Sequence, residues 1–333
     1  QNKNAEISVG ELMVRYLRFA KKRYVKNGHP TSEQDAIRAS LRPLKELYLK
    51  HPANDFGPLC LKAVRQSMVK KVIARRTINS YVGRIQRMFK WAVSEELLPA
   101  SVYQSLATVV GLRKEETKAR ETAPVQPVDD GHVEKTVPYL PPTIADMVRI
   151  QRLTGMRPGE VCIMRPCDID RSSDPWEYTP ESHKTEHHGR GRIVFLGPKT
   201  REILLPYLLR EENSYCFVPW ESEKKRNAEK KANRKSPMTP SQAKRKPKRN
   251  RRRPPGDHYK ASSYLCAIKR ACKKAGIAAW SPNQLRHSLA TDVRKRYGLE
   301  AAQVTLGHSA ADVTQIYAER DATLAKQIAK EVG

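Results

Sequence analysis

The sequence lacks the features that would place the chain in a membrane or outside the cell. Its 333 residues contain no run of about 18 apolar residues, the length that a membrane-spanning helix requires. The first residues, Gln1 to Glu6, are polar and do not form the apolar core of a signal peptide. These absences favour a cytoplasmic protein and predict that no membrane is among its partners.

Paired cysteines and metal-binding motifs are also missing. The six cysteines are scattered, and no two of them form a Cys-x-x-Cys pair, which favours reduced thiols over a disulfide framework. His183, His187 and His188 lie close together in the sequence. Without paired cysteines or a His-Glu-x-x-His spacing, they do not predict a metal site.

Acidic residues are scarce relative to basic ones. The chain has 63 Lys and Arg against 35 Asp and Glu, which gives a formal net charge of +28. Such an excess attracts polyanions, and the usual partner of so basic a globular protein is nucleic acid. From composition alone, a structural RNA-binding protein remains an alternative to a DNA-binding one.

The length suits two domains better than one core. Residues 1–112 are basic, and apolar positions recur there at three- and four-residue steps over 7–27, 33–49 and 77–98, which predicts a helical domain. Residues 113–136 are first charged and then rich in Pro, Asp and Gly without periodicity, which is typical of a linker. Residues 137–333 then form the second domain.

One helix of the first domain combines an apolar stripe with exposed cations. The stripe consists of Ile78, Val82, Ile85, Phe89, Ala92 and Val93. Four basic residues fall mostly away from it: Arg76, Arg84, Arg87 and Lys90. We interpret them as candidate contacts to DNA phosphates, with an ordinary solvated helix face as the alternative.

The second domain is predicted to be mainly helical with a small antiparallel sheet, an α+β fold. Strands are expected at 174–178 and 192–196, the second pairing with an earlier strand through a turn near Gly189–Gly191. Helices are expected at 143–153, 159–164, 200–209, 260–275, 282–297, 299–306, 310–319 and 322–332.

A basic insertion interrupts this domain at residues 221–253. It holds 15 Lys and Arg against 3 Glu, and no apolar period runs through it. This composition predicts a mobile arm that becomes ordered on DNA. A tail for solubility or localisation is the alternative.

Four separated motifs carry residues suited to chemistry on a phosphate. In chain order they are Thr154-Gly155-Met156-Arg157-Pro158-Gly159-Glu160, then Ser182-His183-Lys184-Thr185, then Ser281-Pro282-Asn283-Gln284-Leu285-Arg286, and finally Leu306-Gly307-His308 with Tyr317 nine residues after the histidine. Pro158 and Pro282 suit the first turn of a helix, so each arginine is placed near a helix start. Each motif is weak alone, because an arginine near a helix start is usually structural. The ordered set is much harder to obtain by chance.

This set resembles the signature of the tyrosine recombinases, also called phage integrases, including Xer-like enzymes. The resemblance covers about residues 145–320, and the N-terminal helices are similar, less specifically, to the family's SAM-like core-binding domain. It implies the following roles: Arg157 and Arg286 as the two catalytic arginines, Glu160 as the neighbouring carboxylate, Lys184 as the hairpin lysine, His308 as the late histidine and Tyr317 as the nucleophile.

One position departs from the family pattern. The family usually has a histidine three residues before the second arginine, whereas this chain has Asn283. An amide can donate a hydrogen bond to a phosphate oxygen but cannot take up a proton. General-base assistance to Tyr317 would then come from His308 or from water.

The resemblance implies a site-specific recombinase of the kind found on mobile elements, which cleaves and rejoins DNA strands through a 3′-phosphotyrosine without metal or nucleotide cofactor. It also implies a homotetramer on two double-stranded DNA sites, a dimer per site, with accessory DNA-bending proteins as further partners. A C-terminal stripe of Leu324, Ala325, Ile328, Ala329 and Val332 is expected to dock on a neighbouring protomer. The alternatives are a strand nicker similar to type IB topoisomerases and a DNA-binding protein that has lost catalysis.

Overall fold

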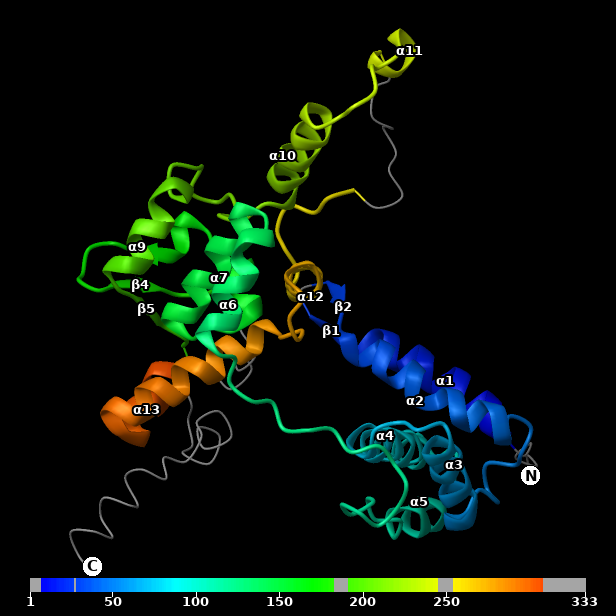
Figure 1. The fold of residues 1–333 in the computed structure, drawn as a ribbon. Helices are drawn as coiled ribbons and strands as arrows, with labels where there is room; N and C mark the ends of the chain where they lie inside the picture. Colours follow the sequence, from blue (N-terminus) through cyan, green and yellow to red (C-terminus); the bar gives the residue numbers. More distant parts are fainter. Residues whose placement is uncertain (1–6, 27, 183–190, 245–253, 308–333) are drawn as a thin grey trace, which may run out of the picture. The chain divides into compact units, whose positions relative to one another are not determined.

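The computed structural model describes residues 7–26, 28–182, 191–244 and 254–307. The chain divides into two compact units between Pro124 and Val125, and each is described by itself (Figure 1). Both are mainly helical with small antiparallel sheets, which confirms the predicted fold class. None of the helices in the described ranges combines the length and the apolar character that crossing a membrane requires.

The N-terminal unit is a helical bundle with one short hairpin. Its helices are α1 (Val9–Arg23), α2 (Ser32–Tyr48), α3 (Pro58–Lys70), α4 (Arg75–Ser94) and α5 (Ala100–Ala107), and its strands are β1 (Val25–Lys26) and β2 (His29–Pro30). Helix α1 begins where the Ser8 side chain accepts from the Glu11 backbone N–H while the Glu11 carboxylate accepts from the Ser8 N–H, a reciprocal cap. The apolar periodicity of the sequence did not predict α3, α5 or the hairpin.

Helix α4 confirms the apolar stripe predicted for it. Ile78, Val82, Ile85, Phe89 and Ala92 are all buried, and Val93 is half-buried. The helix packs against α1, α2, α3 and α5, so this stripe forms the centre of the unit's core. The cations on α4 are consequently directed to the rim of the bundle.

The second unit combines helices with a small three-stranded antiparallel sheet. Its elements up to the sheet are α6 (Asp130–Thr136), η1 (Val137–Tyr139), α7 (Pro142–Thr154), α8 (Pro158–Cys162), η2 (Pro166–Asp168), β3 (Ile169–Asp170), β4 (Trp176–Tyr178) and β5 (Val194–Leu196). After the sheet come α9 (Pro198–Leu204), η4 (Leu205–Tyr207), α10 (Pro219–Ala232), α11 (Pro240–Ala243), α12 (Ala261–Ala275) and α13 (Pro282–Leu306). The strand order is β3-β4-β5, and Tyr178 pairs with Val194.

The predicted linker is too long at its C-terminal end. Its last residues form α6, in which Val133 and Thr136 are buried. The Trp280 indole N–H donates to the Thr136 hydroxyl over 3.0 Å, and Arg152 on α7 pairs with Asp130 at 2.7 Å. A helix of seven residues with two buried positions carries too little periodicity to be recognised in a Pro- and Asp-rich stretch.

Helix α13 contains the break that the two predicted helices imply. Gly298 has φ +87° and ψ 179° inside the helix, between the ranges 282–297 and 299–306. Only glycine adopts this backbone conformation readily, so the chain changes direction there. Leu306 ends the second half, and Gly307 caps it with φ +64°.

The prediction of an irregular basic arm is wrong for its first third. Residues Pro219–Ala232 form α10, which has no buried residue and extends from the unit in Figure 1. Pro219 stands at its first turn, and Lys, Arg, Glu and Ala, all good helix formers, fill the rest. Its base is fixed by an Arg210–Glu221 ion pair at 2.7 Å and by a hydrogen bond from the Tyr259 hydroxyl to Ser222 at 2.8 Å.

Candidate functional site

The first predicted arginine stands at the start of α8, locked to its neighbouring carboxylate. Gly155 ends α7 with φ +63°, the extended backbone of Arg157 follows, and Pro158 begins α8. The Arg157 backbone N–H donates to Glu160 Oε2 over 2.8 Å, and its Nη1 donates to Oε1 over 2.7 Å. The Glu160 side chain is 2% exposed and that of Arg157 is 20% exposed. Glu160 therefore fixes Arg157 through both its backbone and its guanidinium.

A tyrosine of the sheet holds the Arg157–Glu160 pair through the backbone of Glu160. The Tyr178 hydroxyl donates to the Glu160 backbone carbonyl over 2.7 Å, and Tyr178 is fully buried on β4. Burial raises the pKa of this phenol well above its usual value, so it stays a neutral donor. Helix α8 and the strands are thus joined directly below the Arg157–Glu160 pair.

The second predicted arginine, Arg286, is held between two helix ends. It lies on α13 and is 1% exposed. Its Nη1 donates to the Gly155 carbonyl over 2.7 Å, and its Nη2 donates to the Leu306 carbonyl over 2.8 Å. These carbonyls stand at the C-termini of α7 and α13, where the helix dipoles favour a positive charge. The two predicted arginines are therefore brought to the same loop, Gly155–Arg157.

Asn283 lies one turn before Arg286, near the start of α13, and is half-buried. Helix α13 begins at Pro282, and the Ser281 N–H donates to the Gln284 side chain over 2.9 Å. This start keeps Asn283 and Arg286 three residues apart on one helix face, as the sequence predicts.

Three other predicted residues, Lys184, His308 and Tyr317, lie outside the described residues, as do His183, His187, His188 and the predicted C-terminal helices. Within the described ranges, no three His, Cys, Asp or Glu side chains are grouped so that they could hold a metal ion.

A third arginine, Arg192, lies beside the Arg157–Glu160 pair and was not among the predicted site residues. It is 5% exposed, and its Nε lies 3.8 Å from Glu160 Oε2. Burial lowers the pKa of its guanidinium, Glu160 opposes that shift, and the charge of Arg157 adds to it. A sequence signal existed: Arg192 is in phase with Val194 and Leu196, the buried positions of β5.

The cations predicted to contact DNA in the N-terminal unit differ in their surroundings. Arg84 donates through Nε and Nη2 to the Glu33 carboxylate over 2.9 and 2.7 Å, and Arg87 donates to it over 2.9 Å. These ion pairs lower the pKa of Glu33, Arg84 contributing most. Arg76 is exposed, and the ammonium of Lys90 lies 5.8 Å from the centre of the Tyr103 ring. Arg84 thus has a structural role that joins α4 to α2.

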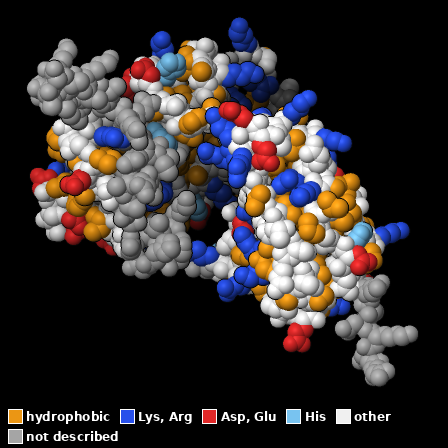
Figure 2. Space-filling view, turned by 90° about the horizontal axis from the view of Figure 1, so that it is seen from below, with side chains coloured by type: hydrophobic (Ala, Val, Ile, Leu, Met, Phe, Trp, Pro, Cys, Tyr) orange, Lys and Arg blue, Asp and Glu red, His pale blue; other side chains and the backbone are white. Residues whose placement is uncertain are grey.

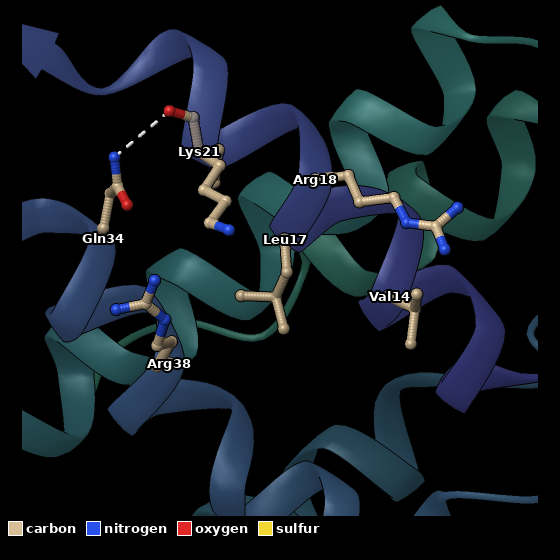
Figure 3. Close-up of a pocket in the computed structure, with 7 residues that line it drawn as sticks. Val14, Leu17, Arg18, Lys21, Gln34 and Arg38 are labelled. Carbon is tan, nitrogen blue, oxygen red and sulfur yellow. Dashed lines mark hydrogen bonds between the residues drawn. The ribbon is translucent and has the colours of Figure 1, made fainter. Parts of the chain in front are cut away.

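Basic side chains also surround a hollow of about 270 Å³ between α1 and α2, drawn in Figure 3. Lys21 and Arg38 extend toward one another across it, and the Gln34 amide donates to the Lys21 carbonyl over 3.3 Å. Its lining holds three cations, Arg18, Lys21 and Arg38, and no carboxylate, thiol or tyrosine. In the face shown in Figure 2, Lys and Arg are more prominent than Asp and Glu, in line with the net charge.

Comparison with known proteins matches residues 139–323 to the phage integrase family. The fold is similar to that of lambda integrase in a dimer bound to a COC′ core site, with a TM-score of 0.65, 14% identity and coverage of 94% of this chain and 96% of that one. A Tn1549 transposon integrase in complex with a circular intermediate DNA gives a TM-score of 0.65 and 15% identity, covering 98% and 100%. A lambda integrase tetramer bound to a Holliday junction gives 0.64 and 13%, covering 95% and 79%. No curated protein sequence matches the chain.

Proposed function

The chain belongs to the phage integrase family and is a tyrosine site-specific recombinase, and we propose that Tyr317 is the nucleophile with which it cleaves and rejoins DNA strands. One observation carries the assignment of the site: Arg157, Glu160 and Arg286, three members of the sequence signature, meet at the Gly155–Arg157 loop. Arg286 is far from the Arg157–Glu160 pair in the sequence, and its hydrogen bond to Gly155, 131 residues away, brings it to the same loop.

The reaction begins when the Tyr317 hydroxyl gives its proton to His308 or to water and its oxygen attacks the phosphorus of one DNA linkage. A bond forms between that oxygen and phosphorus, and the bond from phosphorus to the 5′ oxygen breaks. Lys184 supplies the proton that the leaving oxygen takes up. The 3′-phosphotyrosine conserves the energy of the broken linkage, so attack by a 5′ hydroxyl rejoins a strand and releases the tyrosine.

The two arginines bind the charge that builds on the non-bridging oxygens. A guanidinium binds phosphate through parallel N–H groups, and a site fixed before the reaction needs no rearrangement at the transition state. Glu160 fixes Arg157, and two helix C-termini fix Arg286. His308 and Asn283 add hydrogen-bond donors, and a nearby cluster of cations favours ionisation of Tyr317.

The experiment that tests this function uses DNA flanking the protein's own gene. Incubation with nicked duplexes from that region should trap a covalent protein–DNA complex that resists denaturation and disappears on protease treatment. Strand exchange without any covalent complex would contradict the proposed nucleophile.

We further propose assembly as a homotetramer on two DNA sites. Support comes from two structural neighbours, a lambda integrase dimer bound to a core site and a lambda integrase tetramer bound to a Holliday junction. Accessory DNA-bending proteins and docking of the C-terminal stripe on a neighbouring protomer stay predictions. The topoisomerase-like and catalytically inactive alternatives are not favoured, given the family match across the whole signature.

Helix α10 should contribute to DNA affinity through its exposed cations. Replacing Lys224, Lys225, Lys230 and Lys231 by glutamine removes four positive charges but keeps the anchors at its base. Each phosphate neutralised contributes roughly 0.9 to the slope of log K against log salt. We expect weaker binding and a shallower slope, measured by fluorescence anisotropy over a range of salt concentrations.

A matched control removes four exposed cations from α12 instead, by changing Lys269, Arg270, Lys273 and Lys274 to glutamine. Both variants have the same net charge. If the two slopes fall equally, the effect reflects overall charge, and α10 has no specific DNA contact.

A further inference from the structure

Arg192 lies two residues before β5, in phase with the buried positions of that strand, where an apolar residue is expected. Side chains alternate over residues 193–196: Val194 and Leu196 are buried, whereas Ile193, just before the strand, and Phe195 are 44% and 54% exposed. Arg192 shares the buried side and is itself 5% exposed. Burying a guanidinium is costly unless acceptors satisfy its N–H groups, so such a placement requires an explanation.

The hydrogen-bonding edge of this guanidinium has no acceptor among the described residues. Both Nε and Nη2 are buried without a hydrogen-bond partner there. The Glu160 carboxylate lies 3.8 Å from Nε, beyond hydrogen-bond distance. Elsewhere in this unit Arg152 and Arg165 use the same edge, Nε with Nη2, to bind a carboxylate in a fork. The corresponding edge of Arg192 is therefore suited to a two-oxygen anion.

The backbone at the end of α13 is shaped around this side chain. A Cβ atom on Gly307 would lie 2.3 Å from Arg192 Nη1, far inside van der Waals contact. Glycine at position 307 therefore has two effects: it adopts the φ of +64° readily, and it leaves room for the Arg192 guanidinium. Arg192 is consequently packed between Glu160 and the C-terminus of the helix that carries Arg286.

Among the described residues, the charges of the cluster do not balance. Arg157, Arg192 and Arg286 contribute three positive charges, and Glu160 contributes one negative charge. The Glu160 carboxylate is already hydrogen-bonded to Arg157 through both oxygens. Burial and the like charge of Arg157 lower the pKa of Arg192, yet a guanidinium stays protonated. An anion bound beside it would supply the missing negative charge.

We propose that Arg192 is a third guanidinium of the phosphate site, which binds the non-bridging oxygens of the linkage being cleaved through its Nε–Nη2 edge. This inference rests on the proposed function, because the anion is the DNA phosphate that Tyr317 attacks. The chemistry fits: a planar fork matches two phosphate oxygens, and a preorganised donor stabilises the charge that develops on them.

The test measures single-turnover formation of the covalent complex at saturating DNA. Arg192→Met keeps the length of the side chain and removes its charge, and we expect a loss of about 10²–10³ in rate with little change in DNA affinity. Arg192→Lys keeps the charge but not the fork and should retain more activity than the methionine variant. Arg201→Met is the matched control, because Arg201 also has a buried Nε without an acceptor among the described residues, but its ion-pair partner is Asp174.

A second substrate distinguishes phosphate binding from a structural role. A methylphosphonate at the cleaved linkage replaces one charged oxygen by a neutral methyl group, so a cation that stabilises that charge should matter less. On this linkage, we expect the cleavage rate of Arg192→Met to be much closer to that of the wild-type protein than it is on the phosphate linkage. The ratio of the two rates is taken on one preparation, so incomplete folding cancels.

Two results would overturn the inference: a wild-type rate for Arg192→Met, or an equal loss on both linkages, which would make Arg192 a structural residue. Failure of the proposed function has a different signature, since the unaltered protein would then form no Tyr317-dependent adduct on either substrate.

Discussion

Tyr317→Phe is expected to abolish covalent attachment to DNA while DNA binding persists. The substitution removes one oxygen atom, the one that would form the bond to phosphorus, and keeps the aromatic ring. No other hydroxyl is placed by the family signature to replace it, so the loss should be complete rather than partial. A nicked suicide substrate that traps the adduct, resolved on a denaturing gel, measures cleavage, and a mobility shift on intact DNA measures binding.

The matched control is Tyr297→Phe. Tyr297 lies in the same unit, on α13, and is 72% exposed, so loss of its hydroxyl should change neither binding nor cleavage. A covalent adduct that persists in Tyr317→Phe would remove Tyr317 from the proposed role and require a search for another nucleophile among the remaining tyrosines.

Arg286→Ala is expected to lower the cleavage rate by about 10²–10³ with a much smaller effect on DNA affinity. The guanidinium is 1% exposed and faces the loop that carries Arg157, so we expect it to act on transition-state charge rather than on general attraction to DNA. The measurement is the single-turnover cleavage rate at saturating DNA, compared with the dissociation constant of the same preparation. Equal losses in rate and affinity would mean that Arg286 is only a general DNA contact.

This variant also removes two structural hydrogen bonds. The carbonyls of Gly155 and Leu306 lose their donor, and a buried unsatisfied group costs about 1–3 kcal/mol. Arg152→Ala provides the comparison, because Arg152 joins Asp130 on α6 to Asp292 on α13 and lies outside the proposed chemistry. Both variants should unfold more easily, whereas only Arg286→Ala should cleave slowly once the folded fraction is taken into account.

The local architecture of both units follows from short-range signals in the sequence. The stripe on α4 is fixed by apolar residues at three- and four-residue steps, and Gly298 breaks α13 because only glycine readily adopts its backbone conformation. The helix starts that place Arg157 and Arg286 depend on the prolines at 158 and 282. These signals act over a few residues, so they can be identified without knowing what packs on them.

Local signals of this range do not predict α6 and α10, because contacts with distant residues stabilise these two helices. Helix α6 is stabilised by the indole of Trp280, which is 144 positions away from Thr136. The base of α10 is anchored by Tyr259 and Arg210 rather than by any period of its own. Tertiary contacts of this kind decide where weak helices form, and they leave no local pattern.

The sequence by itself determined the family signature, the helical class and the residues expected to act on phosphate. Only the tertiary structure decided which arginines are structural and which share one site. It bound Arg84 to Glu33, gave Arg286 a carbonyl acceptor 131 residues away, and buried Arg192 beside Glu160. The physical reason is that a guanidinium's role depends on the acceptors that surround it, and in a folded chain these come from segments distant in sequence.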